Sequence, residues 1–375
     1  MLKELKRDKK IFVAMSGGVD SSVAALLLKK QGYDVVGGFM KYWADFQSVS
    51  GHAENRCCSS EARRDAMKVC SKLNIPFLTW DFQKEFKKAV VNDFISGYKK
   101  GITPNPCVIC NKEIKFGLFF EKALKMGADY VATGHYARLA TGDKKQGTRK
   151  RKSLSHVSCR MSLFAAKDKN KDQSYFLWTL TQNQLKHCLF PIGDHLKSEV
   201  RQIAKKAGLP VALKRASQEV CFVYDADLTG FLKKWIKPKK GEIIELKTNK
   251  KIGEHNGIQF YTIGQRVPIG GTGPYYVFSK NLKKNQLIVI GKDDKNSLYN
   301  EIALKNVNWI SGEPPKSAKI LVRTRYRQPL VSAKIMLHAS RFMLYFDQPV
   351  KFVAPGQSAV FYNKENELLG GGVII

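Results

Sequence analysis

The sequence contains no run of about 18 apolar residues, so it predicts no transmembrane helix. Residues 1–10 are mostly charged and lack the apolar core of a secretory signal peptide, which indicates a cytoplasmic protein without a membrane partner. Acidic residues are scarce, because 32 Asp and Glu stand against 64 Lys and Arg and leave a formal net charge of +32 at pH 7. This excess fits a polyanionic partner such as nucleic acid, and it also fits a lysine-rich solvated surface.

The glycine-rich stretch SGGVDSS at 16–22 lacks the lysine and the spacing of a Walker P-loop, and it does not fit G-x-G-x-x-G. It follows an apolar run at 11–15 and precedes a helical pattern at 23–30, so it predicts a strand, a tight turn and a helix. Such a turn aims successive backbone N–H groups at one place, which favours bound phosphate over a turn without a ligand. Asp20 is interpreted as a cap of this helix or as a ligand of Mg²⁺ beside the phosphate.

The chain between about 11 and 210 alternates β and α patterns. This is typical of a doubly wound, mostly parallel α/β sheet that binds ligands at the carboxyl ends of its strands. Ser16, Met40 and Gly134 each fall just after a predicted strand, which places them at one edge of that sheet. Strands are expected at 11–15, 34–40, 76–81 and 130–133, and helices at 22–31, 59–73, 86–100, 116–127, 181–189 and 198–207.

From about residue 211 the pattern changes to short β segments separated by Gly, Pro and Asn. We expect an ATP-binding catalytic domain at 1–210, a small adaptor domain at 211–273 and a C-terminal antiparallel β-barrel at 274–375. Barrel strands are predicted at 275–278, 286–290, 318–325, 332–337, 341–346 and 358–362. The first half of a basic segment at 144–171 is interpreted as an exposed loop between two strands, either solvated or in contact with phosphates.

Eight cysteines in a chain without a signal peptide suggest reduced thiols. Cys107 and Cys110 form C-x-x-C in a turn-rich segment before a helix, where the helix N-terminus favours a thiolate. A zinc site would lack its second pair at ribbon spacing, although Cys57 and Cys58 could contribute. A redox pair would leave the phosphate loop unexplained, whereas sulfur-transfer cysteines fit both features. Cys221 stands alone among apolar residues, which by itself favours a buried core thiol.

An ordered series of blocks makes the chain resemble the tRNA-specific 2-thiouridylase family, within the PP-loop ATP pyrophosphatases that share SGGxDSS. The resemblance extends from Met15 to the glycines at 370–372. The blocks are SGGVDSS at 16–22, FMKYW at 39–43, TPNPCVICNKEIKF at 103–116, ATGHY at 132–136, KDQSYFL at 171–177, CF at 221–222, TIGQR at 262–266, RTRYRQ at 323–328 and PGQSAVF at 355–361.

This resemblance implies an ATP-dependent tRNA sulfurtransferase that converts the wobble uridine (position 34) of Lys-, Glu- and Gln-type tRNAs to 2-thiouridine. ATP would adenylylate O2 of the base, with Mg²⁺ on its phosphates, and sulfur from a cysteine persulfide would displace AMP. A separate protein would supply the persulfide sulfur, and the enzyme would act as a monomer. Two other functions stay open, namely a non-catalytic RNA-binding protein and a PP-loop enzyme that adenylylates a small molecule.

The resemblance also assigns residues. Cys221 corresponds to the persulfide cysteine, and Cys110 to the partner that frees the sulfur or forms a disulfide with Cys221. The implied ATP site comprises Ala14, Met15, Ser16, Gly17, Gly18, Val19, Asp20 and Ser21, with Met40 and Gly134 near the adenosine. Residues expected to meet the tRNA are Asn105, Pro106, Cys107, His135, Lys171, Asp172, Gln173, Arg325, Tyr326 and Gln357.

One position departs from the family pattern, because well-known members carry an aspartate where this chain has Cys107. That aspartate is a proposed acid–base group, and a thiol can also move protons, since its reference pKa is about 8.5. Alternatively, Cys107, Cys110 and Cys221 are three ligands of a [4Fe–4S] cluster whose fourth iron binds sulfide. The persulfide mechanism is preferred, because Cys110 and Cys221 alone satisfy it.

Overall fold

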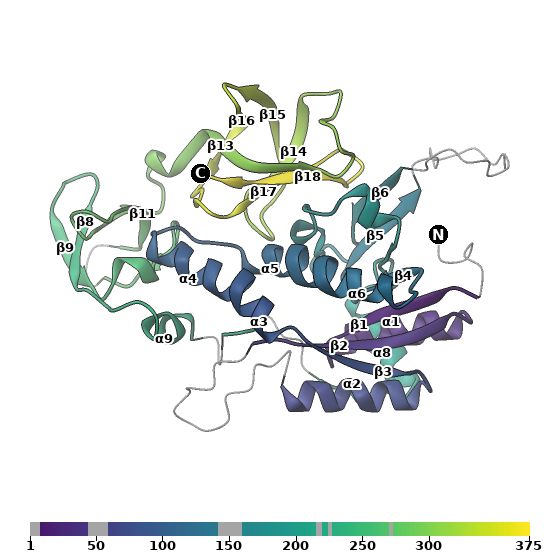
Figure 1. Cartoon of the computed structure of the whole chain (residues 1–375). Helices are drawn as coiled ribbons and strands as arrows, with labels where there is room; N and C mark the ends of the chain where they lie inside the picture. The colour runs from purple at the N-terminus through teal and green to yellow at the C-terminus, as the bar shows by residue number, and fades with distance from the viewer. Residues whose placement is uncertain (1–7, 44–58, 142–159, 215–219, 224–226, 270–272) are drawn as a thin grey trace.

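A parallel five-stranded sheet begins the structure, a computed structural model that describes residues 8–43, 59–141, 160–214, 220–223, 227–269 and 273–375 (Figure 1). Its strands lie in the order β3-β2-β1-β4-β7, and every neighbouring pair is parallel. They are β1 (Lys10–Met15), β2 (Asp34–Lys41), β3 (Phe77–Asp81), β4 (Tyr130–Ala132) and β7 (Cys188–Leu189). Within the described ranges, no helix is long and apolar enough to cross a membrane.

Helices cover both faces of this sheet, because its central strand is apolar on both sides. On β1, Ile11, Val13 and Met15 enter one core, whereas Phe12 and Ala14 enter another. The first core is completed by α1 (Val19–Lys30), α2 (Ser60–Lys72) and α8 (Lys197–Lys206). The second is completed by α3 (Gln83–Phe86), η2 (Lys87–Val91), α4 (Asn92–Lys99), α5 (Pro106–Ile109), η3 (Cys110–Phe119) and α6 (Phe120–Lys125), of which η2 and η3 are π-helical. The predicted doubly wound α/β fold is therefore confirmed.

One predicted helix is partly wrong. The prediction at 181–189 gives only α7 (Gln182–Leu185), which Thr181 caps through the backbone N–H of Gln184. Cys188–Leu189 instead form the edge strand β7, because they pair with β4. A short apolar run has no periodicity of its own, so the neighbouring strand decided its conformation. The remaining short helices are α9 (Leu228–Lys233) and the 3₁₀ turns η4 (Ser174–Phe176), η6 (Ile258–Phe260) and η7 (Lys295–Ser297).

A second sheet forms a middle unit with the strand order β10-β11-β12-β8-β9. Its strands are β8 (Gly241–Glu245), β9 (Lys251–His255), β10 (Arg266–Val267), β11 (Tyr275–Asn281) and β12 (Gln286–Gly291). The sequence placed the strands at 275–278 and 286–290 in the barrel, and this assignment was wrong. Val277, Leu287 and Val289 pack with Ile243 in a separate small core. Alternation predicted these strands correctly, but it carries no information on which sheet they join.

The C-terminal strands form the predicted antiparallel barrel. They are β13 (Leu298–Trp309), β14 (Lys319–Arg323), β15 (Val331–His338), β16 (Arg341–Lys351), β17 (Ser358–Tyr362) and β18 (Glu367–Ile374). The barrel closes because β13 pairs with β16 on one side and with β18 on the other.

An N-terminal hairpin extends the barrel sheet. Its strands β5 (Ala137–Thr141) and β6 (Met161–Ala165) pair with each other, and β6 also pairs with β18. The prediction of a basic loop between two strands is therefore correct in its placement, while residues 142–159 lie outside the described residues. The part of the chain before residue 210 is thus not self-contained, because it contributes two strands to the sheet of the barrel.

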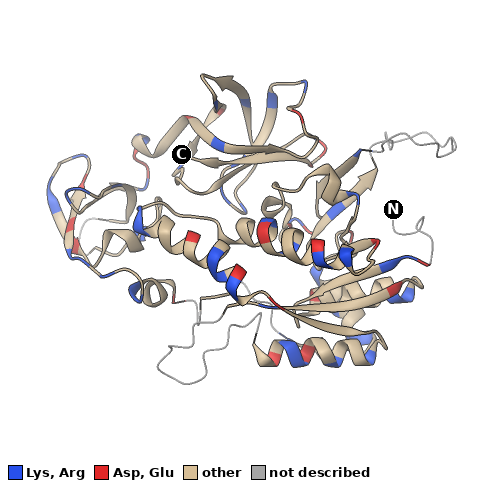
Figure 2. Cartoon of the chain, in the orientation of Figure 1, with Lys and Arg blue, Asp and Glu red and all other residues tan. Residues whose placement is uncertain are grey.

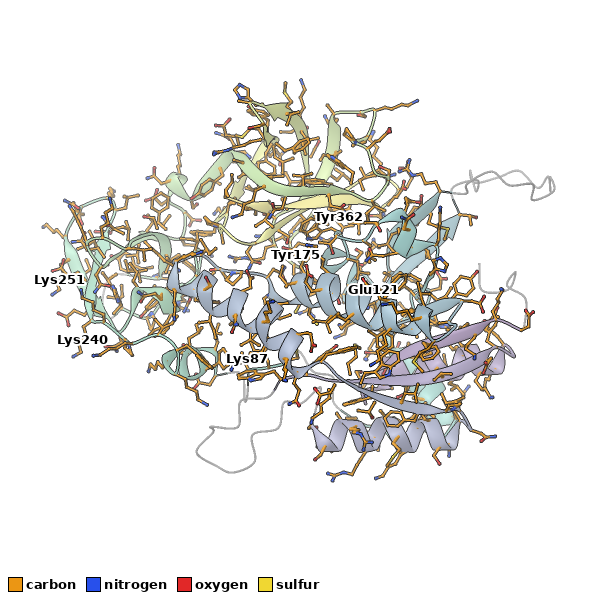
Figure 3. All side chains as sticks on the ribbon, in the orientation of Figure 1. Lys87, Glu121, Tyr175, Lys240, Lys251 and Tyr362 are labelled. Atoms are coloured by element: carbon orange, nitrogen blue, oxygen red, sulfur yellow. The ribbon has the colours of Figure 1, made fainter. Side chains whose placement is uncertain are left out.

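A buried polar network fastens the barrel to the α/β unit. Asp172, which is 5% exposed, accepts hydrogen bonds from the backbone N–H groups of Ala166 and Ser174, each at 3.1 Å. Arg323 of β14 approaches the same carboxylate at 3.4 Å. Tyr362 of β17 lies 3.0 Å from the Ser174 hydroxyl, and Figure 3 shows Tyr175 and Tyr362 at this junction. The barrel is therefore held by charge and hydrogen bonds as well as by apolar packing.

We predict that Arg323→Met lowers the free energy of unfolding by about 3 kcal/mol, because it leaves the buried Asp172 carboxylate without its cation. Chemical denaturation of the full chain measures this loss. Arg341→Met, at the exposed end of β16, is the matched control and is expected to change stability by less than about 0.5 kcal/mol. Equal effects of the two substitutions would contradict a role for Arg323 in joining the units.

Candidate functional site

The turn between β1 and α1 has the geometry that its glycines predict. Gly17 has φ +69°, and a Cβ there would lie 2.2 Å from the carbonyl oxygen of Ala62 in α2. Only glycine fits this close backbone approach. The turn is closed by Ser21, whose Oγ accepts from the backbone N–H of Ser16 at 3.1 Å. No side chain caps the start of α1, so its backbone N–H groups have the arrangement found in turns that bind phosphate.

Asp20 does not cap α1, so that interpretation was wrong. The N-cap residue is Gly18, and no side chain caps the helix there. The Asp20 carboxylate instead receives Lys197 Nζ at 2.6 and 2.7 Å and the Tyr136 hydroxyl at 2.9 Å. Because Lys197 is the first residue of α8, this ion pair ties α8 to the start of α1. It also engages both carboxylate oxygens, so Asp20 is poorly suited to bind Mg²⁺ in this arrangement.

A pocket lies over the turn and brings together most of the predicted site. Asp20 and Gly134 meet here, because a Cβ on Gly134 would lie 2.6 Å from the backbone nitrogen of Ser21. The pocket is lined by all ten residues predicted for ATP, which are Ala14, Met15, Ser16, Gly17, Gly18, Val19, Asp20, Ser21, Met40 and Gly134. Cys110, Cys221, His135 and Gln173 line the same pocket. The structure therefore joins the phosphate loop to two of the three singled-out cysteines.

The third cysteine has a different environment. Cys107 is exposed, whereas Cys110 is buried and Cys221 is partly buried in the pocket wall. Among the described residues, no group of three His, Cys, Asp or Glu side chains could hold a metal ion. Cys107, Cys110 and Cys221 thus do not form a ready-made iron–sulfur site in this arrangement. The suggested zinc contribution of Cys57 and Cys58 lies outside the described residues.

Two residues predicted to meet tRNA belong to the pocket wall. His135 is 8% exposed, and its Nδ1 lies 2.8 Å from the Thr133 hydroxyl. Burial, with the charge of Lys115 as a smaller cause, holds the pKa of His135 well below its usual value of 6.5. The imidazole is therefore neutral near pH 7 and acts as a polar wall rather than as a cation. Gln173 accepts from the backbone N–H of Tyr136 at 3.0 Å, which fixes the turn after β4.

Asn105, Pro106 and Gln357, which are also predicted to meet tRNA, lie around the start of α5. Asn105 caps α5 by accepting from the backbone N–H of Val108 at 3.4 Å, and Pro106 is its buried first residue. Gln357 belongs to residues 355–357, which precede β17 and are called the barrel end here. Its side chain donates to the carbonyl of Thr103 at 2.9 Å. These side chains therefore shape the segment that leads to Cys107 and Cys110.

Four further residues of that prediction lie in or beside the junction of the units. Arg325 donates to the carbonyl of Ile263 at 2.9 Å, and burial lowers its pKa. The Tyr326 ring packs on Phe176 with a centroid distance of 4.6 Å. Lys171 is half-buried in a turn, and Asp172 belongs to the buried network described above. The burial and internal bonds of Asp172 leave its carboxylate little opportunity to contact a nucleic acid.

Four pocket residues were missed by the sequence reasoning. Tyr42, Lys115 and Thr133 line the pocket. All three lie within sequence blocks that carried the family resemblance, so their position in those blocks could have identified them. Lys214 also lines it and forms ion pairs with Asp65 and Glu61 of α2. No local motif marks Lys214, because it reaches the pocket only through the fold.

Comparison with known protein families divides the chain into three consecutive matches that correspond to the three units, except that the first match includes the hairpin β5–β6 of the barrel sheet. The family model described as the tRNA methyl transferase HUP domain matches residues 9–225. The tRNA methyl transferase PRC-barrel domain matches 229–291, and the aminomethyltransferase beta-barrel domain matches 299–374. The middle match includes β11 and β12, in agreement with their pairing in the middle sheet.

Several curated proteins are similar over nearly their full length. The tRNA-specific 2-thiouridylase MnmA of Buchnera aphidicola is 43% identical over 99% of this chain and 98% of its own. The protein of that name from Geobacillus thermodenitrificans is 41% identical over 100% and 96%. Among solved structures, the U34-tRNA thiolase NcsA from Methanococcus maripaludis with its [4Fe-4S] cluster covers 61% of this chain and 68% of its own. Its identity of 16% and TM-score of 0.35 are too low to inform the chemistry here.

We predict that Gly134→Ala destabilises the pocket by about 2 kcal/mol, because the new methyl group would press on the backbone of α1 rather than on a flexible side chain. Thermal unfolding of the full chain gives the loss of stability. Gly291→Ala is the matched control, since a Cβ at Gly291 meets nothing within 4 Å. If Gly134→Ala were as harmless as Gly291→Ala, the packing of this turn on α1 would not constrain the pocket.

We predict that His135 makes the protein less stable in mild acid. Below pH 6.5 the unfolded chain protonates this residue and the folded chain does not, so stability falls by up to about 1.4 kcal/mol per pH unit. Denaturation curves between pH 7 and pH 5.5 measure the slope, and His135→Gln is expected to remove this part of it. His338→Gln, on an exposed strand end, is expected to keep the wild-type slope. An unchanged slope in His135→Gln would contradict the neutral state.

Proposed function

This chain belongs to the tRNA-specific 2-thiouridylase family, and we propose that it uses ATP to replace O2 of a tRNA wobble uridine with sulfur. The single observation that carries the proposal is the pocket in which the SGGVDSS turn meets Cys110 and Cys221. The matching family models carry a methyl transferase name, whereas the relatives at 41–43% identity are named thiouridylases. Two cysteines beside an anion-binding turn fit sulfur transfer after nucleotide activation, so we follow the relatives.

The turn and the pocket lysines are suited to bind the triphosphate. Backbone N–H groups at the start of α1 would receive phosphate oxygens, and Lys115 and Lys214 supply positive charge in the pocket. Lys214 is paired with acidic groups of α2, which holds it at the pocket edge. Since Asp20 is engaged by Lys197 and Tyr136, Mg²⁺ would enter as part of the MgATP substrate.

The first step activates the base. Uridine O2 would attack the α-phosphorus of ATP, form an O–P bond and expel pyrophosphate. The C2 carbonyl is amide-like and a poor electrophile, and adenylylation makes its oxygen part of a good leaving group. The neutral His135 and the buried wall around it would limit the access of water to the reacting carbon. Exclusion of water also lowers the local dielectric constant, which strengthens the electrostatic interactions that hold the phosphates.

The second step transfers sulfur. The terminal sulfur of a Cys221 persulfide would attack C2, and the C2–O bond would break with release of AMP. The Cys110 thiolate would then attack the Cys221 sulfur, which forms a Cys110–Cys221 disulfide and releases 2-thiouridine. A dithiol reductant would reopen that disulfide, and a persulfide-bearing donor protein would reload Cys221. The shared pocket of Cys110 and Cys221 supports this sequence.

The charge of the chain supports a tRNA substrate. Figure 2 shows Lys and Arg on all three units, in keeping with the net charge of +32. A tRNA would bring its wobble base to the pocket while phosphates of its backbone meet this basic surface. Enzymes that act on a base must expose it first, and a wobble base in a single-stranded loop is already accessible. We propose the Lys, Glu and Gln type of tRNA as substrates.

We predict that Cys110→Ser and Cys221→Ser each abolish 2-thiouridine formation, because each removes a sulfur that the transfer step needs. Cys107→Asp is expected to keep most of the activity, since Cys107 is exposed outside the pocket lining. The assay is anaerobic thiolation of a wobble-uridine tRNA with ATP and a persulfide donor. It is read as 2-thiouridine by mass spectrometry and as tRNA-dependent pyrophosphate release, with iron content recorded.

The same assay separates the competing functions. Binding of tRNA without pyrophosphate release would favour a non-catalytic RNA-binding protein, and pyrophosphate release that does not depend on tRNA would favour a small-molecule substrate. Activity that follows iron content and is lost in Cys107→Asp would overturn the persulfide mechanism. Full activity of an iron-free preparation would support it.

A further inference from the structure

Residues 101–105 cross the boundary between the α/β unit and the middle unit. Lys280 of β11 extends into this boundary, and its Nζ donates to the carbonyl of Gly101 at 2.9 Å. Burial lowers the pKa of Lys280 to about 8, so the amine pays a desolvation cost to make this contact. Thr262, also of the middle unit, accepts from the Thr103 hydroxyl at 3.3 Å. The middle unit therefore holds the segment at two of its residues.

The barrel end holds the same segment from its other side. The backbone N–H of Thr103 donates to the carbonyl of Pro355 at 3.0 Å. Gln357 Nε2 donates to the carbonyls of Thr103 and Pro104, at 2.9 and 3.3 Å. A Cβ on Gly356 would lie 2.9 Å from the Thr103 carbonyl oxygen, so the two backbones are in close contact. The polar groups of Thr103 are thus shared between the middle unit and the barrel end.

The held segment leads directly into the helix of the reactive cysteine. Asn105 caps α5, which carries Cys107, and η3 continues it from Cys110. The side chain of Asn105 also interacts with the hydroxyl of Tyr175, which in turn donates to the carbonyl of Ser358. A helix start that is tied on several sides has little freedom to shift. Groups from two other units thus contact the segment that precedes the helix of Cys110.

We propose that Lys280 and Gln357 are positioning residues that act on Cys110 through residues 101–105. Neither side chain lines the pocket. Both side chains donate hydrogen bonds to backbone carbonyl groups of residues 101–105, the segment that precedes α5. If this segment became looser, the helix that carries Cys110 could open locally and move away from the turn between β1 and α1. For Gln357 this replaces the role of a direct tRNA contact, because its amide nitrogen is already committed to two carbonyls. The middle unit and the barrel end would thereby contribute to the chemistry without touching the reacting atoms.

The test measures thiol accessibility in the full chain and does not require the proposed function. Iodoacetamide alkylation is followed by peptide mass mapping in wild type, Lys280→Met, Lys280→Arg and Gln357→Glu. Cys110, which is 6% exposed, is the reporter, and exposed Cys107 is the internal reference. Cys70 and Cys188, both 0% exposed, report global unfolding. The matched controls are Lys283→Met, in the exposed turn between β11 and β12, and Gln202→Glu, at an exposed position of α8.

In Lys280→Met, alkylation of Cys110 relative to Cys107 is expected to rise about fivefold, the factor that corresponds to one lost hydrogen bond. In Gln357→Glu, which loses two hydrogen bonds to the segment, the rise is expected to be at least as large. Cys70 and Cys188 are expected to stay protected, Lys280→Arg to restore the wild-type rate, and both controls to match wild type. Wild-type alkylation of Cys110 in both variants would overturn the proposal. So would a parallel rise at Cys70 and Cys188, because the contacts would then stabilise the whole fold rather than the cysteine helix.

A second measurement rests on the proposed function. In the tRNA thiolation assay, Lys280→Met is expected to lower kcat about tenfold while KM for ATP stays unchanged, since only the sulfur-transfer geometry is disturbed. A rise in KM for ATP with unchanged kcat would contradict the assignment to Cys110. If wild type itself made no 2-thiouridine, the proposed function would fail, while the alkylation result would still decide whether Lys280 and Gln357 position Cys110.

Discussion

The close backbone contact between the 16–18 turn and α2 is the constraint on which the site depends. A side chain at position 17 would collide with the carbonyl of Ala62, and a side chain at position 134 would collide with the backbone of the first turn of α1, so both positions require glycine. With both contacts in place, the N-terminus of α1 faces the pocket and its N–H groups are directed at one point. Asp20 then serves to tie α8 to this end through Lys197, rather than to cap it. The anion site is thus built mainly from backbone.

The sulfur transfer that we propose needs thiols beside the turn between β1 and α1, and the fold places two there. Cys110 arrives from the helix that starts at α5, and Cys221 arrives from the region after Lys214. The two cysteines come from distant parts of the chain, so their shared pocket is a product of the fold. His135 completes the wall as a neutral group, because burial suppresses its protonation. Besides Lys115, the pocket carries two charged side chains that are paired, Lys214 with acidic groups of α2 and Asp20 with Lys197, and this mixture of charged and apolar lining suits the triphosphate and base that we propose.

The other two units serve this pocket from outside. The barrel is fastened to the α/β unit by Arg323 and the buried carboxylate of Asp172, and by the hairpin β5–β6 that extends its sheet. The middle unit reaches the segment before α5 through Lys280. The basic charge is spread over all three units, so a large polyanion could contact each of them while one of its bases enters the pocket. In our proposal, the units whose surfaces a large polyanion could contact are therefore the same units that help to position Cys110.

The sequence by itself determined the doubly wound sheet and the strand, glycine turn and helix around 16–22, because these rest on local periodicity and on glycines with a local geometric role. The family resemblance, not periodicity, supplied the ten residues expected around ATP, and the fold gathers them in one pocket. The family blocks added Cys110 and Cys221 as a pair, which spacing alone could not do. Only the tertiary structure decided the sheet to which 275–290 belongs, the strand at Cys188–Leu189, and the ion pair of Asp20 with Lys197. Strand pairing and buried charge pairs join residues far apart in sequence, and local pattern holds no record of their partners.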